Sequence, residues 1–173
     1  MKENDQSFVR VYVGIGSNLD DPVNQVKNAV RTLMVIDGTY THQFSSLYKN
    51  PPMGMQDQPA YVNAVGAMDT TLTAHGLLDI MQTIELRAGR IRTADRWGPR
   101  TLDLDLLIFG KHLINTNRLT VPHPGIDKRP FVLIPLLEIA PSLIVPLLGS
   151  VQVLADSLTS GQHDAVVPIG GVE

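Results

Sequence analysis

Two aspartates, Asp103 and Asp105, stand two residues apart in an apolar segment whose pattern is typical of a β-strand. Side chains alternate between the faces of a strand, so both carboxylates point to one face. The apolar side chains point to the other: Leu102, Leu104, Leu106 and Ile108. Neighbouring carboxylates repel, and a bound Mg²⁺ ion, which prefers oxygen ligands, removes that repulsion. The pattern indicates a metal site, with a solvated strand face carrying structural salt bridges as the alternative.

Basic residues are concentrated just before this strand. From Glu85 to Arg100 the chain carries five arginines against two carboxylates, which leaves a local charge of +3. Planar guanidinium groups suit phosphate oxygens, which they bind in pairs of hydrogen bonds. A metal site beside such a segment indicates phosphate chemistry on a compact anion.

The composition excludes several classes of protein. The net charge of −3 gives no general reason to bind nucleic acid or an anionic membrane. The chain has no cysteine, which excludes disulfides, thiolate metal sites and cysteine nucleophiles. Its first residues are polar and lack the apolar core of a signal peptide, so we expect a cytoplasmic protein. The apolar run 131–148 is interrupted by prolines and a glutamate, which favours a buried helix, a turn and a short strand over a membrane span.

The order of expected elements predicts the fold class. Strands are expected at 8–15, 39–48 and 61–68, helices from Pro22 and at 73–87, and the aspartate strand follows. This order favours an α+β sandwich of the ferredoxin-like kind, with helices packed on a mainly antiparallel sheet. The second and third strands are expected to pair as a hairpin around the loop 50–59. We expect a single domain over residues 1–173, with a mobile tail after about residue 158.

Several polar residues have both a functional and a structural interpretation. Tyr61 and Asn63 share a strand face and could stack on and hydrogen-bond a heterocycle, or simply form a half-exposed face. The Gly-Ile-Gly-Ser-Asn run at 14–18 lacks the Gly-Lys-Ser/Thr ending and the glycine spacing of a phosphate loop, which favours a structural turn. His123 lies between two prolines, where a structural histidine is the commoner case.

Separated motifs of this chain closely resemble the 6-hydroxymethyl-7,8-dihydropterin pyrophosphokinase family. They are Gly-Ser-Asn at 16–18, Pro-Pro-Met-Gly at 51–54, Tyr-Val-Asn at 61–63, Gly-Arg-Ile-Arg at 89–92, Arg-Trp-Gly-Pro-Arg-Thr-Leu-Asp-Leu-Asp at 96–105, Pro-His at 122–123 and Arg-Pro-Phe-Val-Leu at 129–133. The resemblance covers about residues 9–146. The long aspartate motif is highly specific, whereas Gly-Ser-Asn alone is weak.

The resemblance implies an ATP-dependent diphosphokinase of folate biosynthesis, which gives AMP and the pterin diphosphate. Asp103 and Asp105 would hold two Mg²⁺ ions, and together with Arg92 they would be the catalytic residues. The ATP site would be lined by Gln82, Glu85, Arg92, Arg96, Arg100, Arg118, Thr120, His123 and Arg129. The pterin would lie near Pro51, Met53, Gly54, Tyr61, Asn63, Trp97 and Phe131.

Two rival functions remain at this stage. A nucleotide-binding regulatory module with the same fold would bind ATP without reacting, and the absence of an obvious general base favours it. An RNA-binding ferredoxin-like domain would need exposed aromatic residues and a basic face, which a net charge of −3 and 5% aromatic content argue against. We expect a monomer that acts on small molecules, with no nucleic acid or membrane partner.

Overall fold

A computed structural model of the chain describes residues 7–53, 57–89 and 99–173. Its central sheet has six strands, in the order β10-β3-β4-β1-β5 with β2 also paired to β4. Every pairing in it is antiparallel. The strands are β1 (Val9–Ser17), β2 (Thr39–Phe44), β3 (Leu47–Asn50), β4 (Tyr61–Thr70), β5 (Asp103–Phe109) and β10 (Val167–Gly170). The predicted antiparallel sheet is therefore present.

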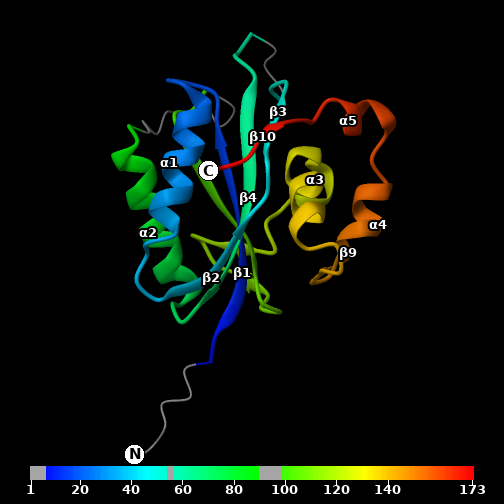
Figure 1. Cartoon of the computed structure of the whole chain (residues 1–173). Coiled ribbons are helices and arrows are strands. Elements are labelled where there is room, and N and C mark those ends of the chain that lie inside the picture. Colours follow the sequence, from blue (N-terminus) through cyan, green and yellow to red (C-terminus); the bar gives the residue numbers. More distant parts are fainter. Residues whose placement is uncertain (1–6, 54–56, 90–98) are drawn as a thin grey trace, which may run out of the picture.

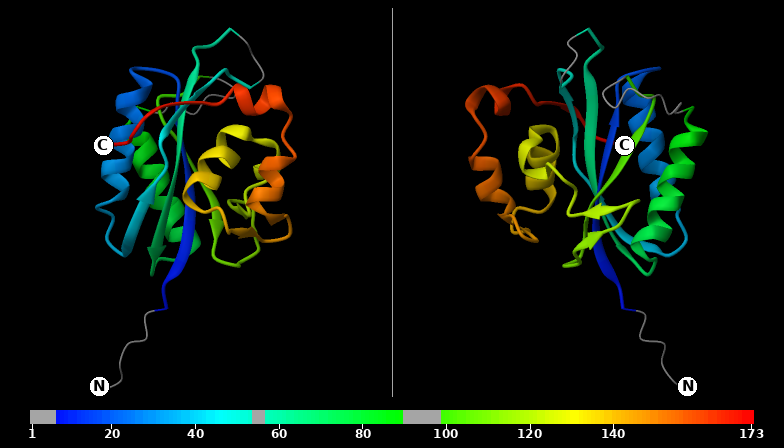
Figure 2. Two further views of the ribbon diagram at one scale, coloured as in Figure 1. Left: turned by 45° about the vertical axis from the view of Figure 1, so that its right-hand side comes forward. Right: turned by 180° about the vertical axis from the view of Figure 1, so that it is seen from behind.

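Helices cover both faces of this sheet, so the molecule has three layers (Figure 1). One face carries α1 (Pro22–Leu33) and α2 (Ala74–Arg87), and the other carries α3 (Pro130–Ile139), α4 (Val151–Asp156) and α5 (Ser160–Asp164). The views in Figure 2 show the same separation. The first two helices begin as the sequence predicts, because Asp21 and Thr73 cap them by accepting hydrogen bonds from backbone N–H groups of their first turns.

Each face of the sheet has its own hydrophobic core. The core under α1 and α2 contains side chains from β1, β4 and β5 together with both helices, including Val13, Val26, Leu77, Met81 and Leu104. The core under α3 and α4 is formed by a different set, including Tyr12, Val65, Leu107, Leu133 and Val151. The two cores hold the sheet from both sides, which makes it a rigid base for side chains at its edge.

A β-bulge changes the alternation in β5. The register of β1 against β5 shifts between Tyr12 and Val13, so Tyr12 pairs with Ile108 and Val13 pairs with Leu106. Leu107 is the extra residue, and Ile108 packs in the α3-side core rather than with Leu104. The prediction that Ile108 lies on the face opposite the aspartates was therefore wrong.

The second predicted strand, 39–48, is divided in two. β2 pairs with the Thr70 end of β4 and β3 pairs with its Tyr61 end. The chain bends between them at Ser45, whose N–H donates to the carbonyl of Val65 and whose hydroxyl accepts from the Val65 N–H. The predicted pairing around the 50–59 loop is confirmed in β3 and β4.

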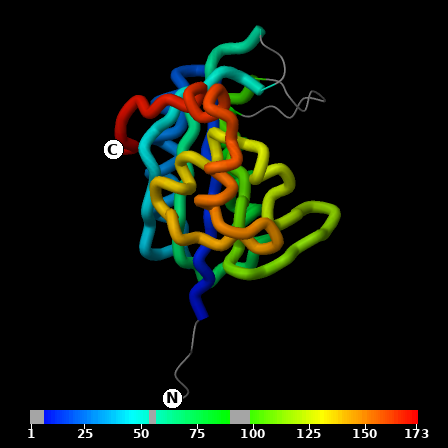
Figure 3. The backbone as a smooth tube through the Cα atoms, turned by 90° about the vertical axis from the view of Figure 1, so that its right-hand side faces the viewer, coloured from blue at the N-terminus to red at the C-terminus, as the bar shows by residue number. Residues whose placement is uncertain are grey.

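Smaller elements complete the chain. They are the β6 (Ile114–Asn115) and β7 (Thr120–Val121) hairpin, the 3₁₀ turn η1 (Ile126–Lys128), and the β8 (Ile144–Val145) and β9 (Gly149–Ser150) hairpin. Figure 3 looks onto the face where α3, α4 and α5 lie in front of the sheet. In the described part of the chain, no helix is long and apolar enough to cross a membrane.

The C-terminal segment returns to the sheet. Its strand β10 pairs with β3, and the Lys27 ammonium of α1 donates a hydrogen bond to the backbone oxygen of Glu173. The sequence analysis assigned no strand here. The motion of the tail after residue 158 stays a prediction.

Candidate active site

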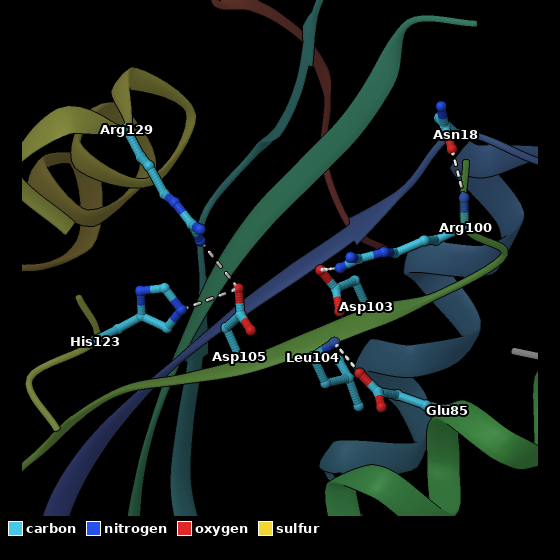
Figure 4. Close-up of polar contacts among 8 residues, drawn as sticks. All are labelled: Asn18, Glu85, Arg100, Asp103, Leu104, Asp105, His123 and Arg129. Atoms are coloured by element: carbon cyan, nitrogen blue, oxygen red, sulfur yellow. Dashed lines mark hydrogen bonds and ion pairs between the residues drawn. The ribbon is translucent and has the colours of Figure 1, made fainter. Parts of the chain in front are cut away.

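The two aspartates of β5 lie close to cationic partners (Figure 4). Arg100 Nη1 is 2.6 Å from Asp103 Oδ2, and Arg129 Nη1 is 3.2 Å from Asp105 Oδ2. His123 Nε2 is 3.7 Å from the same Asp105 oxygen. Arg100 comes from the segment before β5, while Arg129 stands at the N-terminus of α3. The two carboxylates thus lie between two guanidinium groups, one on each side.

Glycines leave space next to these carboxylates. In the pairing of β1 with β5, Gly16 is opposite Asp103 and Gly14 is opposite Asp105. On its other side Gly16 is opposite Asn63 of β4. Both glycines line the cavity, and because they have no side chain, neighbouring groups can approach the sheet closely there. A Cβ on Gly16 would lie 2.6 Å from Asn63 Oδ1, so the fit there is tight.

A cavity of about 280 Å³ stands over this part of the sheet. Its size is close to the lower limit for small-molecule sites. The lining residues are Gly14, Ile15, Gly16, Asn50, Met53, Tyr61, Asn63, Ala64, Arg100, Asp103, Asp105, His123, Pro124, Arg129, Phe131 and Val132. Nine residues expected at the site are among them: Met53, Tyr61, Asn63, Arg100, Asp103, Asp105, His123, Arg129 and Phe131.

The lining residues Asn50, Met53, Tyr61, Asn63 and Phe131, which we call the aromatic half of the lining, suit a flat heterocycle. Tyr61 and Phe131 contribute aromatic rings, and the Arg129 guanidinium lies 6.0 Å from the centre of the Phe131 ring. Asn63 Nδ2 donates to Asn50 Oδ1 over 2.6 Å, which fixes the orientation of the Asn63 amide. Burial raises the pKa of Tyr61, so its hydroxyl stays protonated near neutral pH.

The polar half of the lining consists of Arg100, Asp103, Asp105, His123 and Arg129, and the pKa values of Asp105 and His123 are shifted. Burial and the neighbouring Asp103 raise the pKa of Asp105, while His123 and the arginines act against that shift. Burial lowers the pKa of His123, which favours its neutral form. His123 Nδ1 is buried and has no hydrogen-bond partner within the described residues. Arg100, Asp103, Asp105 and Arg129 supply charged groups, so this half of the lining is suited to a polar ligand.

The carboxylate pair fits Mg²⁺ that is shared with a ligand. Within the described residues, no group of three or more histidine, cysteine, aspartate or glutamate side chains could hold a metal ion. Mg²⁺ commonly binds proteins through one or two carboxylates, with substrate phosphates and water completing its coordination. Asp103 and Asp105 supply that number of carboxylates, and Arg100 and Arg129 suit the phosphates.

Five expected contact residues lie outside the cavity lining. They are Pro51, Gln82, Glu85, Arg118 and Thr120. The Glu85 carboxylate is buried and accepts a hydrogen bond of 2.7 Å from the Leu104 N–H, so it holds the edge strand β5 in place. Arg118 forms an ion pair with Asp79 of α2 on the surface. Nucleotide and pterin contacts of these five residues stay predictions.

Four further predicted residues, Gly54, Arg92, Arg96 and Trp97, lie outside the described residues. Gly14 and Gly16 also line the cavity but were not predicted as site residues, and a pterin contact of Asn50 was left open. The available signal was the Gly-x-Gly spacing at 14–16, which puts two glycines on one face of the first strand. Asn50 becomes a candidate only through its pairing with Tyr61 and its contact with Asn63.

Comparisons with known proteins agree with this geometry. Residues 12–141 match the family model of 7,8-dihydro-6-hydroxymethylpterin-pyrophosphokinase (HPPK). The chain is 46% identical over 139 residues to a 2-amino-4-hydroxy-6-hydroxymethyldihydropteridine pyrophosphokinase of Haemophilus influenzae, covering 80% of this chain and 86% of that protein. It is 48% identical over 137 residues to the enzyme of the same name from Pseudomonas aeruginosa, covering 79% and 84%.

The fold also matches solved structures. A crystal structure of Plasmodium falciparum HPPK-DHPS with pteroate superposes with a TM-score of 0.69 at 11% identity. The match covers 89% of this chain but only 41% of that longer chain. It supports the α+β fold alone, and it confirms the predicted fold class.

Proposed function

The chain belongs to the 7,8-dihydro-6-hydroxymethylpterin-pyrophosphokinase family, and from this premise we propose that its cavity transfers the diphosphate of ATP to 6-hydroxymethyl-7,8-dihydropterin. Membership makes the chain a transferase of folate biosynthesis that uses ATP. The observation that carries the assignment of the site is the placement of Asp103 and Asp105 in one cavity with Arg100, Arg129 and an aromatic wall.

The pterin occupies the aromatic half of the cavity. Tyr61, Phe131 and Met53 provide apolar contacts for a flat bicyclic ring, and aromatic rings stack favourably on it. The Asn63 amide, held by Asn50, hydrogen-bonds the polar edge of the ring. A buried donor or acceptor discriminates strongly against ligands that leave it unpaired, so Asn63 selects for the pterin.

The phosphates occupy the half between Arg100 and Arg129. Attack of the hydroxymethyl oxygen on the β-phosphorus breaks the bond to the α-phosphate oxygen, so AMP leaves. Asp103 and Asp105 would hold two Mg²⁺ ions, which when bound offset phosphate charge and lower the pKa of the attacking alcohol. Arg100 and Arg129 orient the phosphates through their guanidinium groups, and neutral His123 donates or accepts a hydrogen bond there.

The remaining roles follow the family resemblance. By that resemblance, Arg92 and Arg96 add positive charge at the phosphates, and the pterin lies near Pro51, Gly54 and Trp97. Gln82, Glu85, Arg118 and Thr120 complete the nucleotide site. The expectation of a monomer in the cytoplasm remains part of this proposal.

The test is product analysis of the purified chain with Mg²⁺, ATP and 6-hydroxymethyl-7,8-dihydropterin. AMP and the pterin diphosphate should appear in equal amounts on anion-exchange chromatography. Adding excess EDTA should stop the reaction, since the site depends on a divalent ion. ATP binding without AMP formation would instead support the non-catalytic regulatory module.

Variants of the aspartates test the assignment of the site. Asp105→Asn keeps the shape of the side chain but removes its charge, so turnover should fall by about 10³-fold or more, as for other groups that act only in the transition state. Asp69→Asn is the matched control, because Asp69 is a β4 carboxylate paired with Arg10 outside the cavity lining. Near-normal turnover of Asp105→Asn, or an equal loss in Asp69→Asn, would remove Asp105 from the metal site.

A further inference from the structure

The side chain of Asn18 joins two segments that are distant in the sequence. Its Oδ1 accepts a hydrogen bond of 2.8 Å from the Arg100 N–H. Its Nδ2 donates to the carbonyl of Pro59 over 3.2 Å and to Gln58 Oε1 over 3.3 Å. The Asn18 N–H also donates to the Arg100 carbonyl over 3.1 Å. Asn18 is only 1% exposed, so these bonds are shielded from water.

The two segments lead to the two halves of the cavity. Pro59 is two residues before Tyr61, where β4 begins and the aromatic wall stands. Arg100 carries the guanidinium that contacts Asp103, at 2.6 Å, in the phosphate half. Asn18 itself is not among the lining residues. One buried amide therefore holds the backbone beside each half, without touching either ligand space.

We propose that Asn18 is a positioning residue that couples the pterin half of the cavity to its phosphate half, so that binding of one ligand strengthens binding of the other. This inference rests on the proposed function. When phosphates fix Arg100, its N–H and carbonyl fix Asn18, and the Asn18 amide then fixes Pro59 and the start of β4. The second ligand then binds to backbone segments that the first has already ordered, so it does not meet the free-energy cost of ordering them. This difference is the origin of positive coupling.

One substitution of Asn18 distinguishes the hydrogen bond made by its Oδ1 from those made by its Nδ2. Asn18→Asp keeps an oxygen that accepts from the Arg100 N–H. The second carboxylate oxygen replaces Nδ2 and faces the Pro59 carbonyl and Gln58 Oε1, which are acceptors too. The bond to the phosphate half is kept, while the bonds to the pterin half are lost and replaced by repulsion.

The experiment measures binding, not turnover. Calorimetry gives the Kd of 6-hydroxymethylpterin for the full chain with Mg²⁺, with and without α,β-methylene-ATP, whose bridging carbon blocks the reaction. The ratio of the two Kd values is the coupling factor. We expect a factor above one for the unmodified chain, and a factor about fivefold smaller for Asn18→Asp, the size expected for losing one or two buried hydrogen bonds.

Thr70→Val is the matched control. The Thr70 hydroxyl is buried and donates a hydrogen bond of 2.8 Å to the Gly38 carbonyl, at the opposite end of β4 from Tyr61. This variant should lower stability but keep the coupling factor. A coupling factor of one in the unmodified chain, an unchanged factor in Asn18→Asp, or an equal fall in Thr70→Val would each overturn the proposal.

A second variant covers the case in which Asn18→Asp does not fold. Gln58→Ala removes one of the two acceptors of Asn18 Nδ2 at a half-buried loop position, and it should lower the factor about twofold. An unchanged factor there would overturn the proposal. If the variants form AMP and keep the coupling factor of the unmodified chain, the role of Asn18 is refuted but the proposed function is not. If the coupling factor falls as expected in the variants but the unmodified chain forms no AMP, the proposed function is refuted instead.

Discussion

Gly16→Ala should displace Asn63, which we propose binds the pterin, while leaving the fold intact. A Cβ at this position would lie 2.6 Å from Asn63 Oδ1, and ordinary van der Waals contact begins at 3.4 Å, so the amide must move by about 0.8 Å. Asn63 cannot move freely, because its Nδ2 is bonded to Asn50 Oδ1 over 2.6 Å. A misplacement near 1 Å at a reacting or binding group costs about 10²-fold in rate.

We therefore expect kcat/KM for the pterin to fall by about 10- to 100-fold in this variant, mainly through KM. KM for ATP should change little, because among the described residues, apart from its chain neighbours, the only side chain within 4 Å of the added methyl group is that of Asn63. The backbone of Gly16 is in β1 and needs no left-handed conformation, so alanine adds no strain there. Steady-state kinetics with each substrate varied in turn measures both constants.

Gly14→Ala is the matched control for this prediction. It adds the same methyl group two residues away on the same face of β1, where the nearest atom is Leu107 Cδ2 at 3.5 Å, an ordinary contact. The Asn63 amide is untouched. If Gly16→Ala leaves the pterin KM unchanged, or if Gly14→Ala raises it equally, displacement of Asn63 is not the cause and the reasoning fails.

Three further predictions concern the residues around the site. Burial and Glu138 raise the pKa of Tyr48 above its usual value of 10.0, so above pH 10 the folded chain keeps a proton that the unfolded chain loses. The stabilisation of the folded state is therefore complete below pH 10 and declines above it. Unfolding followed by circular dichroism should show a weaker decline of stability with pH in Tyr48→Phe. An identical alkaline profile would contradict this. Glu85→Leu leaves the buried Leu104 N–H without its acceptor and should lower the free energy of unfolding in urea by about 1–3 kcal/mol. Glu85→Gln keeps an acceptor and should lower it less. Equal losses of unfolding free energy in the two variants would show that the hydrogen bond is unimportant. Arg129→Lys should raise KM for ATP, because an ammonium group cannot form the paired hydrogen bonds of a guanidinium, and an unchanged KM would remove Arg129 from the phosphates.

The elements that depend on local sequence could be predicted. Pro22 and Thr73 mark the starts of α1 and α2, and the alternation at 103–106 puts both aspartates on one face. The bulge at Leu107 was not predictable, because it depends on the register of β5 against β1. β10 was missed for the same reason, since its partner β3 is more than a hundred residues earlier in the chain.

The candidate site likewise has residues that could be predicted from the sequence and residues that could not. Residues whose chemistry is unusual for a strand or a loop, such as Asp103 and Asp105, were found from the sequence and lie in the cavity. Residues that act by lacking a side chain or by holding the backbone were not found as site residues, as Gly16 and Asn18 show. Their role appears only when β1, β4 and the segment before β5 are seen together.

The charged groups of the site can balance one another both with and without bound ligands. Asp103 and Asp105 are balanced by Arg100 and Arg129, so the cavity carries no large net charge from these four groups. On the proposed function, ATP would bring about four negative charges and two Mg²⁺ ions would bring four positive ones, so the balance would be kept if they bound together. Either ligand alone would leave an excess charge in a partly buried site, which is costly. On the proposed function, the arginines that pair with the carboxylates here would pair with phosphates in the loaded site, where the carboxylates would hold the metal ions.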